Sequence, residues 1–422
     1  MTSLVEADPQ EVVAFKGRYR APTVEEIDPS FIHMHPAVME RSGFEALEHY
    51  NEPVEPRVLD AFDYGRQAEV TVESAEEFIS AIQSRLTRAE TVYDRVFDIM
   101  RSKRFRAGTV TQTRFDENKE LFRPTVEKRM KEGLPLEFVL PSFPFKHKNP
   151  VKVSRRSPDM AELLCLCRLH EICHALGRVY EPGAKFVVIS DGMVYRDMFA
   201  VTEHEALSYR DRSKQMVGQL GFEDSIEVTD MEYLVDSRRE LFDFVQERLE
   251  PVFADWWRAN PDSLRRASLI QASTANVNTA ESVTHDLVQM ATKDVLLDTQ
   301  EQDAVSTLET IKTQTVERAE KGAFQFALFM YVLKEINLVP SCYPGAVRAT
   351  VHPKPTHWGL HLVNRDSRVF PWQGVAYQNN NGQWRIKYEF EVTRARATPV
   401  HVRGDDDLFP FYYEHSDLPA AR

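Results

Sequence analysis

The sequence predicts an α/β protein with a Rossmann-like parallel-sheet core, a large helical region and a C-terminal antiparallel β layer. Two short apolar runs rich in β-forming residues, 136–140 (LEFVL) and 185–189 (KFVVI), flank a helical pattern over 159–179. Pro and Gly bound both runs, and the helical segment is long enough to connect two parallel strands. The alternating segments 346–352 and 384–393 predict the antiparallel layer.

The chain divides into three expected regions. Residues 1–70 are polar and Pro-containing, which is typical of an extension that is packed on a core or partly disordered. Residues 71–394 carry the α/β domain, with a mostly helical insertion at about 230–337, and residues 395–422 form an acidic and aromatic tail. The other predicted elements are helices over 37–50, 74–104, 117–132, 203–218, 231–257, 263–270 and 283–337, and strands over 225–228, 357–363 and 369–377.

The composition is that of a globular protein. Of the 422 residues, 42% are apolar and 28% are charged, which suits one large domain or two ordinary ones. The net charge of −13 argues against non-specific binding to nucleic acid. No apolar run approaches the ~20 residues of a membrane span, and the first residues lack the pattern of a signal peptide. Three of the four cysteines crowd one helix, so we expect a reducing, cytoplasmic setting.

Polar side chains follow both core strands. Residues 142–149 come after the first strand and residues 190–197 after the second. Because ligands of open parallel sheets bind beyond the carboxyl ends of the strands, we expect both segments to line one crevice. Asp191 directly follows the second strand and is the best candidate for a general base. The alternative that both segments are ordinary loops stays open.

A further polar group lies on the segment 346–352. Arg348, Thr350 and His352 alternate along a predicted strand, so their side chains would share one face. A face with these side chains suits an anionic ligand. A solvated strand face is the alternative.

The crossover helix contains the pattern H-E-x-x-H at His170, Glu171 and His174. On a helix, residues four apart share a face, so the two imidazoles could bind zinc, with Glu171 as the general base. A third ligand would have to come from Glu203, His204 or Glu205. The position between two strands argues for a sheet crossover in which the histidines are helix-surface and core residues. A zinc-dependent hydrolase stays open as an alternative.

Several longer runs resemble one family. FVLPSFPFKHKNPVKV, SPDMAELL and YEPGAKFVVISDGMVYRDMFAV are similar to the pyoverdine/dityrosine biosynthesis family, the isocyanide (isonitrile) synthases. The later segment YPGAVRATVHPKP…FPWQGV resembles the C-terminal signature of that family, and the resemblance spans residues 71–392. It implies an enzyme of secondary metabolism that joins the nitrogen of an L-amino acid, tyrosine or tryptophan, to one carbon of ribulose 5-phosphate.

The resemblance also implies the chemistry of the site. The amine attacks the sugar ketone to form an imine, carbon–carbon bonds then break and phosphate leaves, so acid/base and cationic groups are needed. We expect no cofactor and no metal, the two small molecules as partners, a downstream biosynthetic oxygenase, and neither nucleic acid nor membrane. The candidates are Asp191 as base, His352 as acid or phosphate ligand, the cations Lys146, Arg348 and Lys354, and the substrate-binding residues Ser190, Asn149, Tyr195, Asp197 and Trp372.

Three positions depart from the family pattern. His147 stands where serine is expected, His357 lies where a lysine is expected, and Gln373 ends a motif that is expected to end in histidine. These departures leave the expected fold intact but bear on the identity of the substrate. A catalytically inactive family member with a binding role is therefore a further alternative.

Overall fold

The computed structural model describes residues 4–28, 54–107, 112–146, 152–279, 301–351, 356–363, 369–405 and 408–416. The helix predicted over 37–50 and the first part of the helix predicted over 283–337 lie outside them.

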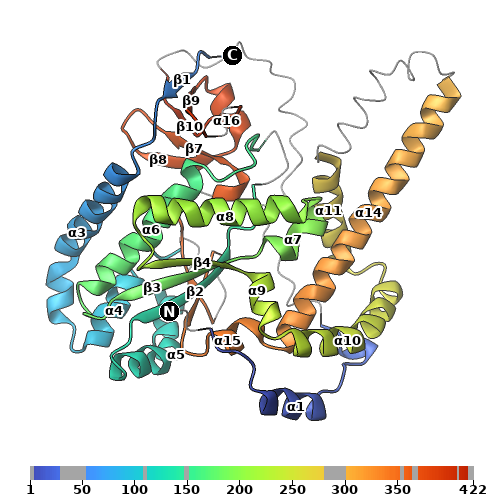
Figure 1. Cartoon of the computed structure of the whole chain (residues 1–422), viewed down its shortest axis with the longest axis horizontal. Coiled ribbons are helices and arrows are strands. Elements are labelled where there is room, and N and C mark those ends of the chain that lie inside the picture. Colours follow the sequence, from blue (N-terminus) through green and yellow to red (C-terminus); the bar gives the residue numbers. More distant parts are fainter. Residues whose placement is uncertain are drawn as a thin grey trace.

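A five-stranded parallel sheet forms the centre of the molecule (Figure 1). In spatial order its strands are β4 (Ile226–Asp230), β3 (Ala184–Ser190), β2 (Leu136–Ser142), β5 (Val347–Thr350) and β6 (Trp358–Gly359), and every neighbouring pair is parallel. The predicted parallel core is thus confirmed. β5 and β6 were expected in the antiparallel layer, and that expectation is wrong because β5 pairs in parallel with β2.

The connection from β2 to β3 is the predicted crossover helix, α6 (Met160–Gly177). Asp159 is its N-cap, and its carboxylate accepts a hydrogen bond from the Ala161 backbone N–H at 2.7 Å. Glu162 completes a capping box by accepting from the Asp159 N–H at 3.0 Å. The helix lies against β3 with most of its apolar side chains buried, so it forms part of the core and not only a surface connection.

The order of the strands reverses beside β2. The chain runs outward from β2 through β3 to β4, and it returns later to add β5 and β6 on the other side of β2. The carboxyl ends of β2 and β5 therefore flank a topological switch point, which is where open α/β sheets bind ligands. The predicted crevice after β2 and β3 consequently borders β5 as well.

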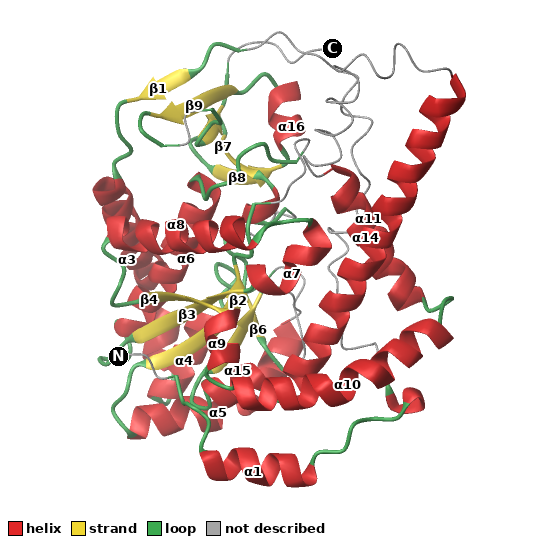
Figure 2. Cartoon of the chain, turned by 45° about the vertical axis from the view of Figure 1, so that its right-hand side comes forward, coloured by secondary structure: helices red, strands yellow, loops and turns green. Residues whose placement is uncertain are grey.

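Helices surround this sheet (Figure 2). Two predicted helices are each divided in the structure: 74–104 becomes α3 and α4, with Thr91 capping α4, and 231–257 becomes α9 and α10. The long α14 packs on α7, α10 and α11 and extends away from the body of the molecule (Figure 1). The helices are α1 (Pro9–Arg18), α3 (Tyr64–Arg88), α4 (Val92–Met100), α5 (Gln112–Lys131), α7 (Gly192–Phe199), α8 (Glu203–Leu220), α9 (Met231–Asp236), α10 (Arg239–Ala259), α11 (Leu264–Thr279), α14 (Glu301–Glu335) and α15 (Leu338–Cys342).

A second sheet lies above α8 and the parallel sheet in the view of Figure 1. Its order is β1 (Arg57–Leu59), β9 (Thr398–Val402), β10 (Tyr412–Glu414), β7 (Val375–Gln378) and β8 (Trp384–Lys387). β7 with β8 and β9 with β10 are antiparallel, which confirms a C-terminal layer with antiparallel pairing. β1 with β9 and β10 with β7 are parallel.

Segments from both ends of the described chain contribute to the second sheet, and one predicted strand is shorter than expected. The expected N-terminal extension supplies β1 to the second sheet. The expected tail from residue 395 supplies β9 and β10. The strand predicted over 384–393 ends at Lys387, and the chain continues as the short helix α16 (Glu389–Arg394).

All four cysteines, Cys165, Cys167, Cys173 and Cys342, are buried and free. Burial raises the pKa of the Cys167 thiol to about 11, so this thiol remains protonated and unreactive at neutral pH. None of the helices in the described part of the chain has an apolar stretch long enough to cross a membrane.

Candidate functional site

Asp191 lies directly after β3, at the N-cap position of α7, but its side chain does not cap the helix. Its Oδ1 atom is buried and has no hydrogen-bond partner in the described part of the chain. Burial raises the pKa of this carboxyl group to about 7, and its own backbone N–H and the Arg348 guanidinium oppose the rise only in part. The group can therefore exchange a proton near neutral pH, as a general base must.

The backbone around Asp191 is packed closely against the segment that leaves β2. A Cβ atom on Gly192 would lie 2.2 Å from the Pro144 carbonyl oxygen, so only glycine fits there. The Ser190 hydroxyl donates to the Phe143 carbonyl oxygen at 2.9 Å, and Phe143 itself has a φ of 60°. The Ser190 hydroxyl thus connects the ends of β2 and β3. A contact between this hydroxyl and substrate stays a prediction.

Arg348 provides a positive charge opposite Asp191. It lies on β5 with a half-buried side chain, and burial lowers its pKa to about 10, with Asp191 opposing that fall. Its guanidinium makes no hydrogen bond or ion pair with any residue that the structure describes. The group remains charged at neutral pH, so it is available to a carboxylate or phosphate.

Tyr195 lies one helical turn after Asp191 on α7. Its ring stacks on Phe326 of α14 at 5.0 Å between centroids and meets Phe199 edge-on at 6.0 Å. Burial, together with the negative charge of Asp191, raises the pKa of the Tyr195 phenol. These rings form an aromatic wall beside the carboxylate. The sequence did not single out Phe326, because its apolar run is typical of a core helix.

Lys146 lies in a buried cluster of charged groups after β2. Its side chain is fully buried, and its Nζ lies 2.9 Å from both Asp159 Oδ2 and Glu162 Oε2. It also donates to the carbonyl oxygens of Pro371 and Gly374 at 2.9 and 3.1 Å. An ammonium has three donors, so these acceptors already use them. The ammonium of Lys146 is thus engaged with protein groups, and its role as a cation for the substrates stays a prediction.

Trp372 and Asp197 lie in contrasting surroundings. Trp372 is buried in the short helix η4 (Pro371–Gln373), where it stacks on Phe370 at 5.2 Å and packs against Phe143 at 5.7 Å. Asp197 lies on the exposed side of α7, with its carboxylate 3.8 Å from the Arg196 side chain. Asp197 is thus directed to solvent and not toward the other candidates. His147, Asn149, His352 and Lys354 lie outside the described residues.

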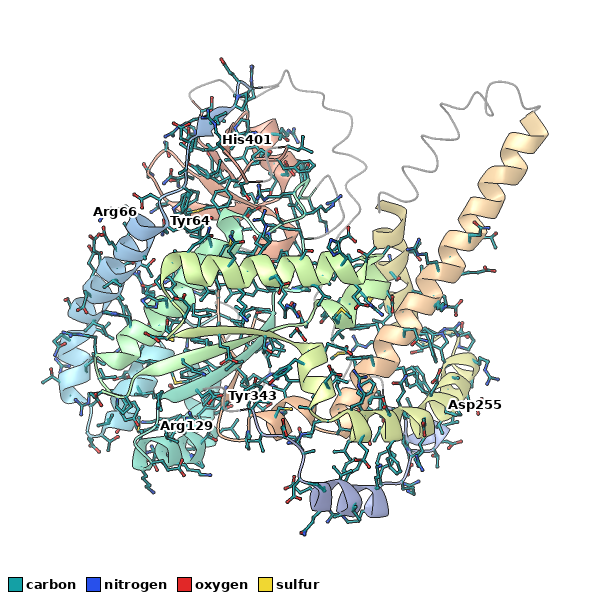
Figure 3. All side chains as sticks on the ribbon, in the orientation of Figure 1. Tyr64, Arg66, Arg129, Asp255, Tyr343 and His401 are labelled. Atoms are coloured by element: carbon teal, nitrogen blue, oxygen red, sulfur yellow. The ribbon has the colours of Figure 1, made fainter. Side chains whose placement is uncertain are left out.

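The opposite edge of the parallel sheet is occupied by other contacts. Figure 3 labels Arg129 and Tyr343 at the lower side of the sheet. The Arg129 guanidinium pairs at 3.0 Å with Glu137, the second residue of β2. Asp191 and Arg348 interact near the carboxyl-terminal edge, while this ion pair lies near the amino-terminal one.

The histidines of α6 are engaged with protein partners. His170 Nδ1 lies 2.7 Å from Ser225 Oγ, and His174 Nε2 lies 2.7 Å from Glu76 Oε1. Burial lowers the pKa of His170 to about 4, with His174 adding to the effect. Glu171 forms ion pairs with Arg104 and Arg168. Within the described part of the chain, no group of three or more His, Cys, Asp or Glu is placed to hold a metal ion.

The fold and the site define a class of protein. A parallel α/β sheet carries a carboxyl group with a pKa of about 7 and a guanidinium with no ion-pair partner among the described residues, next to a switch point. This arrangement is typical of α/β proteins that bind small anionic molecules at that point.

The chain belongs to the pyoverdine/dityrosine biosynthesis protein family, whose model matches residues 126–400. It is 28% identical to an L-tyrosine isonitrile synthase of Pseudomonas aeruginosa, over 70% of this chain and 84% of that protein. It is 26% identical to an L-tyrosine isonitrile synthase of Xenorhabdus nematophila, over 69% of this chain and 82% of that protein. An L-tryptophan isonitrile synthase of Fischerella ambigua, AmbI2, is also 26% identical over 68% of this chain and 79% of its own length.

A solved structure supports the fold. The crystal structure of the PvcA protein from Pseudomonas aeruginosa matches with a TM-score of 0.52 and 24% sequence identity, over 77% of this chain and 100% of PvcA. The sequence resemblance to the family is thus confirmed by the family model, and the fold by this structural neighbour.

Proposed function

We propose that this chain is an isocyanide synthase. It converts the amino group of an L-amino acid, tyrosine or tryptophan, into an isocyanide and takes the added carbon from ribulose 5-phosphate. Membership of the family and the similarity to relatives named L-tyrosine and L-tryptophan isonitrile synthases support this reaction. The single structural observation that carries it is the buried, unpaired oxygen of Asp191 on a carboxyl group with a pKa of about 7.

Asp191 acts as the general base in this proposal. An amino acid carries an ammonium group at neutral pH, and its nitrogen must lose a proton before it can attack the sugar ketone. A carboxylate with a pKa near the working pH can accept that proton and return it when water leaves to form the imine. Later steps break carbon–carbon bonds of the sugar and release phosphate. The amine thereby gains one carbon and loses two hydrogens.

Arg348 holds an anionic part of the substrates, either the α-carboxylate of the amino acid or the phosphate of the sugar. Its guanidinium has no described ion-pair partner and faces the same edge as Asp191. A guanidinium can form two parallel hydrogen bonds to either anion. The bound anion would therefore be oriented relative to the base.

The aromatic wall favours an aromatic amino acid. The ring centroid of Tyr195 lies 6.0 Å from that of Phe199 and 5.0 Å from that of Phe326. A substrate ring can join such a cluster at the usual separations of ~4.5–7 Å. This supports tyrosine or tryptophan over an aliphatic substrate.

The test is mass spectrometry of the purified protein incubated with ribulose 5-phosphate and each of the standard amino acids in turn. We expect one aromatic amino acid to gain a carbon and lose two hydrogens, and the carbon to carry label when the sugar phosphate is ¹³C-labelled. Absence of any labelled product from folded protein would contradict the proposal and favour an inactive family member with a binding role.

A further inference from the structure

We propose that Ser142 and Gln373 form a hydrogen-bonding subsite for a hydroxyl or ammonium donor of the substrates. The inference rests on the proposed function and deepens it, because it names two further contact residues of the same site. From the sequence, Gln373 was noted only as a departure from the family pattern, and Ser142 only as the first residue of the segment 142–149.

The first observation is that both side chains are buried without partners. Ser142 is 2% exposed and Gln373 is 3% exposed. The Ser142 Oγ and the Gln373 Oε1 have no hydrogen-bond partner among the residues that the structure describes. Buried polar atoms are nearly always paired in native proteins, so two unpaired atoms in one region indicate a missing ligand or solvent partner.

The second observation is their location. Ser142 is the last residue of β2, beside the switch point, and in the sheet register it lies opposite Ser190, the residue before Asp191. The residue after Ser142 is Phe143, whose ring packs against Trp372 at 5.7 Å. Gln373 follows Trp372 directly. Ser142 and Gln373 are therefore the chain neighbours of two residues, Phe143 and Trp372, whose rings are in contact.

The third observation is that the backbone around Gln373 is held firmly. The buried ammonium of Lys146 binds the carbonyl oxygens of Pro371 and Gly374, which lie on either side of Trp372 and Gln373. A Cβ atom on Gly374 would lie 2.4 Å from the Lys387 carbonyl oxygen, so this turn is also pressed against β8. The backbone at Gln373 is therefore fixed in position beside the carboxyl end of β2.

The chemistry of the two atoms defines the ligand group. An amide oxygen only accepts hydrogen bonds, and a serine hydroxyl donates or accepts. A phosphate dianion offers acceptors alone, so it would leave the Gln373 oxygen unpaired. The group that fits is a hydroxyl of the sugar phosphate or the ammonium of the amino acid.

The test compares Gln373→Met and Ser142→Ala with Gln83→Met, which makes the same change as the first variant at an exposed position of α3. Steady-state kinetics give KM for each substrate separately. We expect Gln373→Met to raise one KM about tenfold, the loss of about one hydrogen bond, with kcat changed much less. A raised KM for ribulose 5-phosphate identifies the donor as a sugar hydroxyl, and a raised KM for the amino acid identifies the ammonium.

A second readout separates a ligand contact from a structural one. Replacing an unpaired buried acceptor by an apolar group is neutral or stabilising. We therefore expect the thermal midpoint of unliganded Gln373→Met and Ser142→Ala to stay the same or rise. Both KM values within twofold of wild type in both variants would overturn the subsite, as would a lower midpoint without any change in KM.

Failure of the proposed reaction can be distinguished from failure of the subsite. If the wild-type protein makes no isocyanide, calorimetric titration with tyrosine, tryptophan and ribulose 5-phosphate, one at a time, replaces kinetics. Binding that Gln373→Met weakens and Gln83→Met retains would support the subsite without the reaction. Equal binding by wild type and Gln373→Met, or no binding of any of the three compounds, would overturn it.

Discussion

At the residue scale, Asp191 and Arg348 show which force dominates the site. Their opposite charges attract, yet burial raises the pKa of the carboxyl group to about 7 and lowers that of the guanidinium to about 10. Desolvation therefore outweighs the mutual attraction. A carboxylate in a direct, hydrogen-bonded ion pair would show the reverse shift. The raised pKa makes the Asp191 carboxylate a stronger base, as a proton-transfer role requires.

The first prediction concerns this base. Asp191→Asn should lower kcat by at least about a hundredfold, because positioned general bases contribute ~10²–10⁴-fold. The fold should persist, since the amide carries no buried charge. Turnover by mass spectrometry and circular dichroism check both statements. Asp197→Asn is the matched control on the exposed side of the same helix, and an Asp191→Asn variant with full activity would remove Asp191 from the mechanism.

The second prediction concerns pH. Asp191 must be deprotonated to act, so kcat/KM should rise with pH through about 7. Arg348 favours the carboxylate and holds its pKa down, so Arg348→Met should move this rise to higher pH as well as raise the KM of an anionic substrate. A pH–rate profile for both proteins measures the shift. An unchanged midpoint in Arg348→Met would show that the two charges are not coupled.

At the element scale, a buried charge cluster connects four elements. Lys146 joins the segment after β2 to the N-terminus of α6 through Asp159 and Glu162, and to η4 through two carbonyl oxygens. Tyr209 of α8 donates to Glu162 Oε1 at 2.8 Å. One ammonium faces two carboxyl groups, and burial raises the pKa of Glu162 to about 8 despite the opposing effect of Lys146.

The third prediction follows from the sign of that shift. An exposed glutamate titrates near 4.5, so between 4.5 and 8 the folded protein keeps a proton on Glu162 that the unfolded chain has lost. The free energy of unfolding should therefore fall as pH rises through this window. Glu162→Gln cannot ionise and should show a flatter dependence in urea titrations at several pH values. Equal slopes for wild type and Glu162→Gln would contradict the raised pKa.

Helix α14 shapes the site by its close approach to α7. A Cβ atom on Gly322 would lie 2.6 Å from the Asp197 carbonyl oxygen. Phe326 lies one turn further along α14 and stacks on Tyr195. Glycine at position 322 thus sets the distance between the two helices and the position of the aromatic wall.

The fourth prediction tests this packing. Gly322→Ala should push α14 away from α7 and destabilise the protein by about 1–3 kcal/mol, with a higher KM for the amino acid. Gly17→Ala is the matched control, because Gly17 lies in helix α1 with no atom near the added methyl group. That control should be neutral or stabilising by ~0.5–1 kcal/mol. Urea titration measures both, and equal effects at the two positions would refute the packing argument.

At the scale of the whole molecule, the second sheet brings together distant parts of the chain. In the sequence, β1 precedes α3, whereas β9 and β10 follow α16. In the sheet, β9 lies between β1 and β10. The Arg57 guanidinium pairs with Glu414 at 3.0 Å across this sheet. β10 also pairs with β7, which directly follows the turn that carries Trp372 and Gln373. The second sheet therefore supports the edge of the site.

The fifth prediction concerns the segment that the sequence marked as a tail. A chain ending at Arg394 loses β9 and β10, including the fully buried Val400 and the hydrogen bond from Tyr413 to Glu389 at 2.6 Å. We expect this chain to be poorly soluble or to lose substrate binding. Solubility, near-ultraviolet circular dichroism and calorimetric binding provide the measurements. A truncated protein with wild-type affinity would show that the segment is dispensable.

The sequence predicted those features that local patterns encode. The strands β2 and β3, the helix between them and the position of Asp191 at the end of β3 all depend on periodicity and on Pro and Gly signals close by. The contacts of the Lys146 ammonium could not be predicted from local patterns, because its partners lie at positions 159, 162, 371 and 374. The pairing of β5 with β2 is equally long-range.

By itself, the sequence determined the fold class, the family and the strand end that carries the candidate base. Short-range hydrophobic periodicity and contiguous motifs suffice for these conclusions. Only the tertiary structure decided that Lys146 is enclosed in an ion-pair cluster, that the C-terminal segment completes a sheet, and that Ser142 and Gln373 keep unpaired polar atoms. Burial and pairing depend on neighbours that are remote in the chain, and no local pattern contains them.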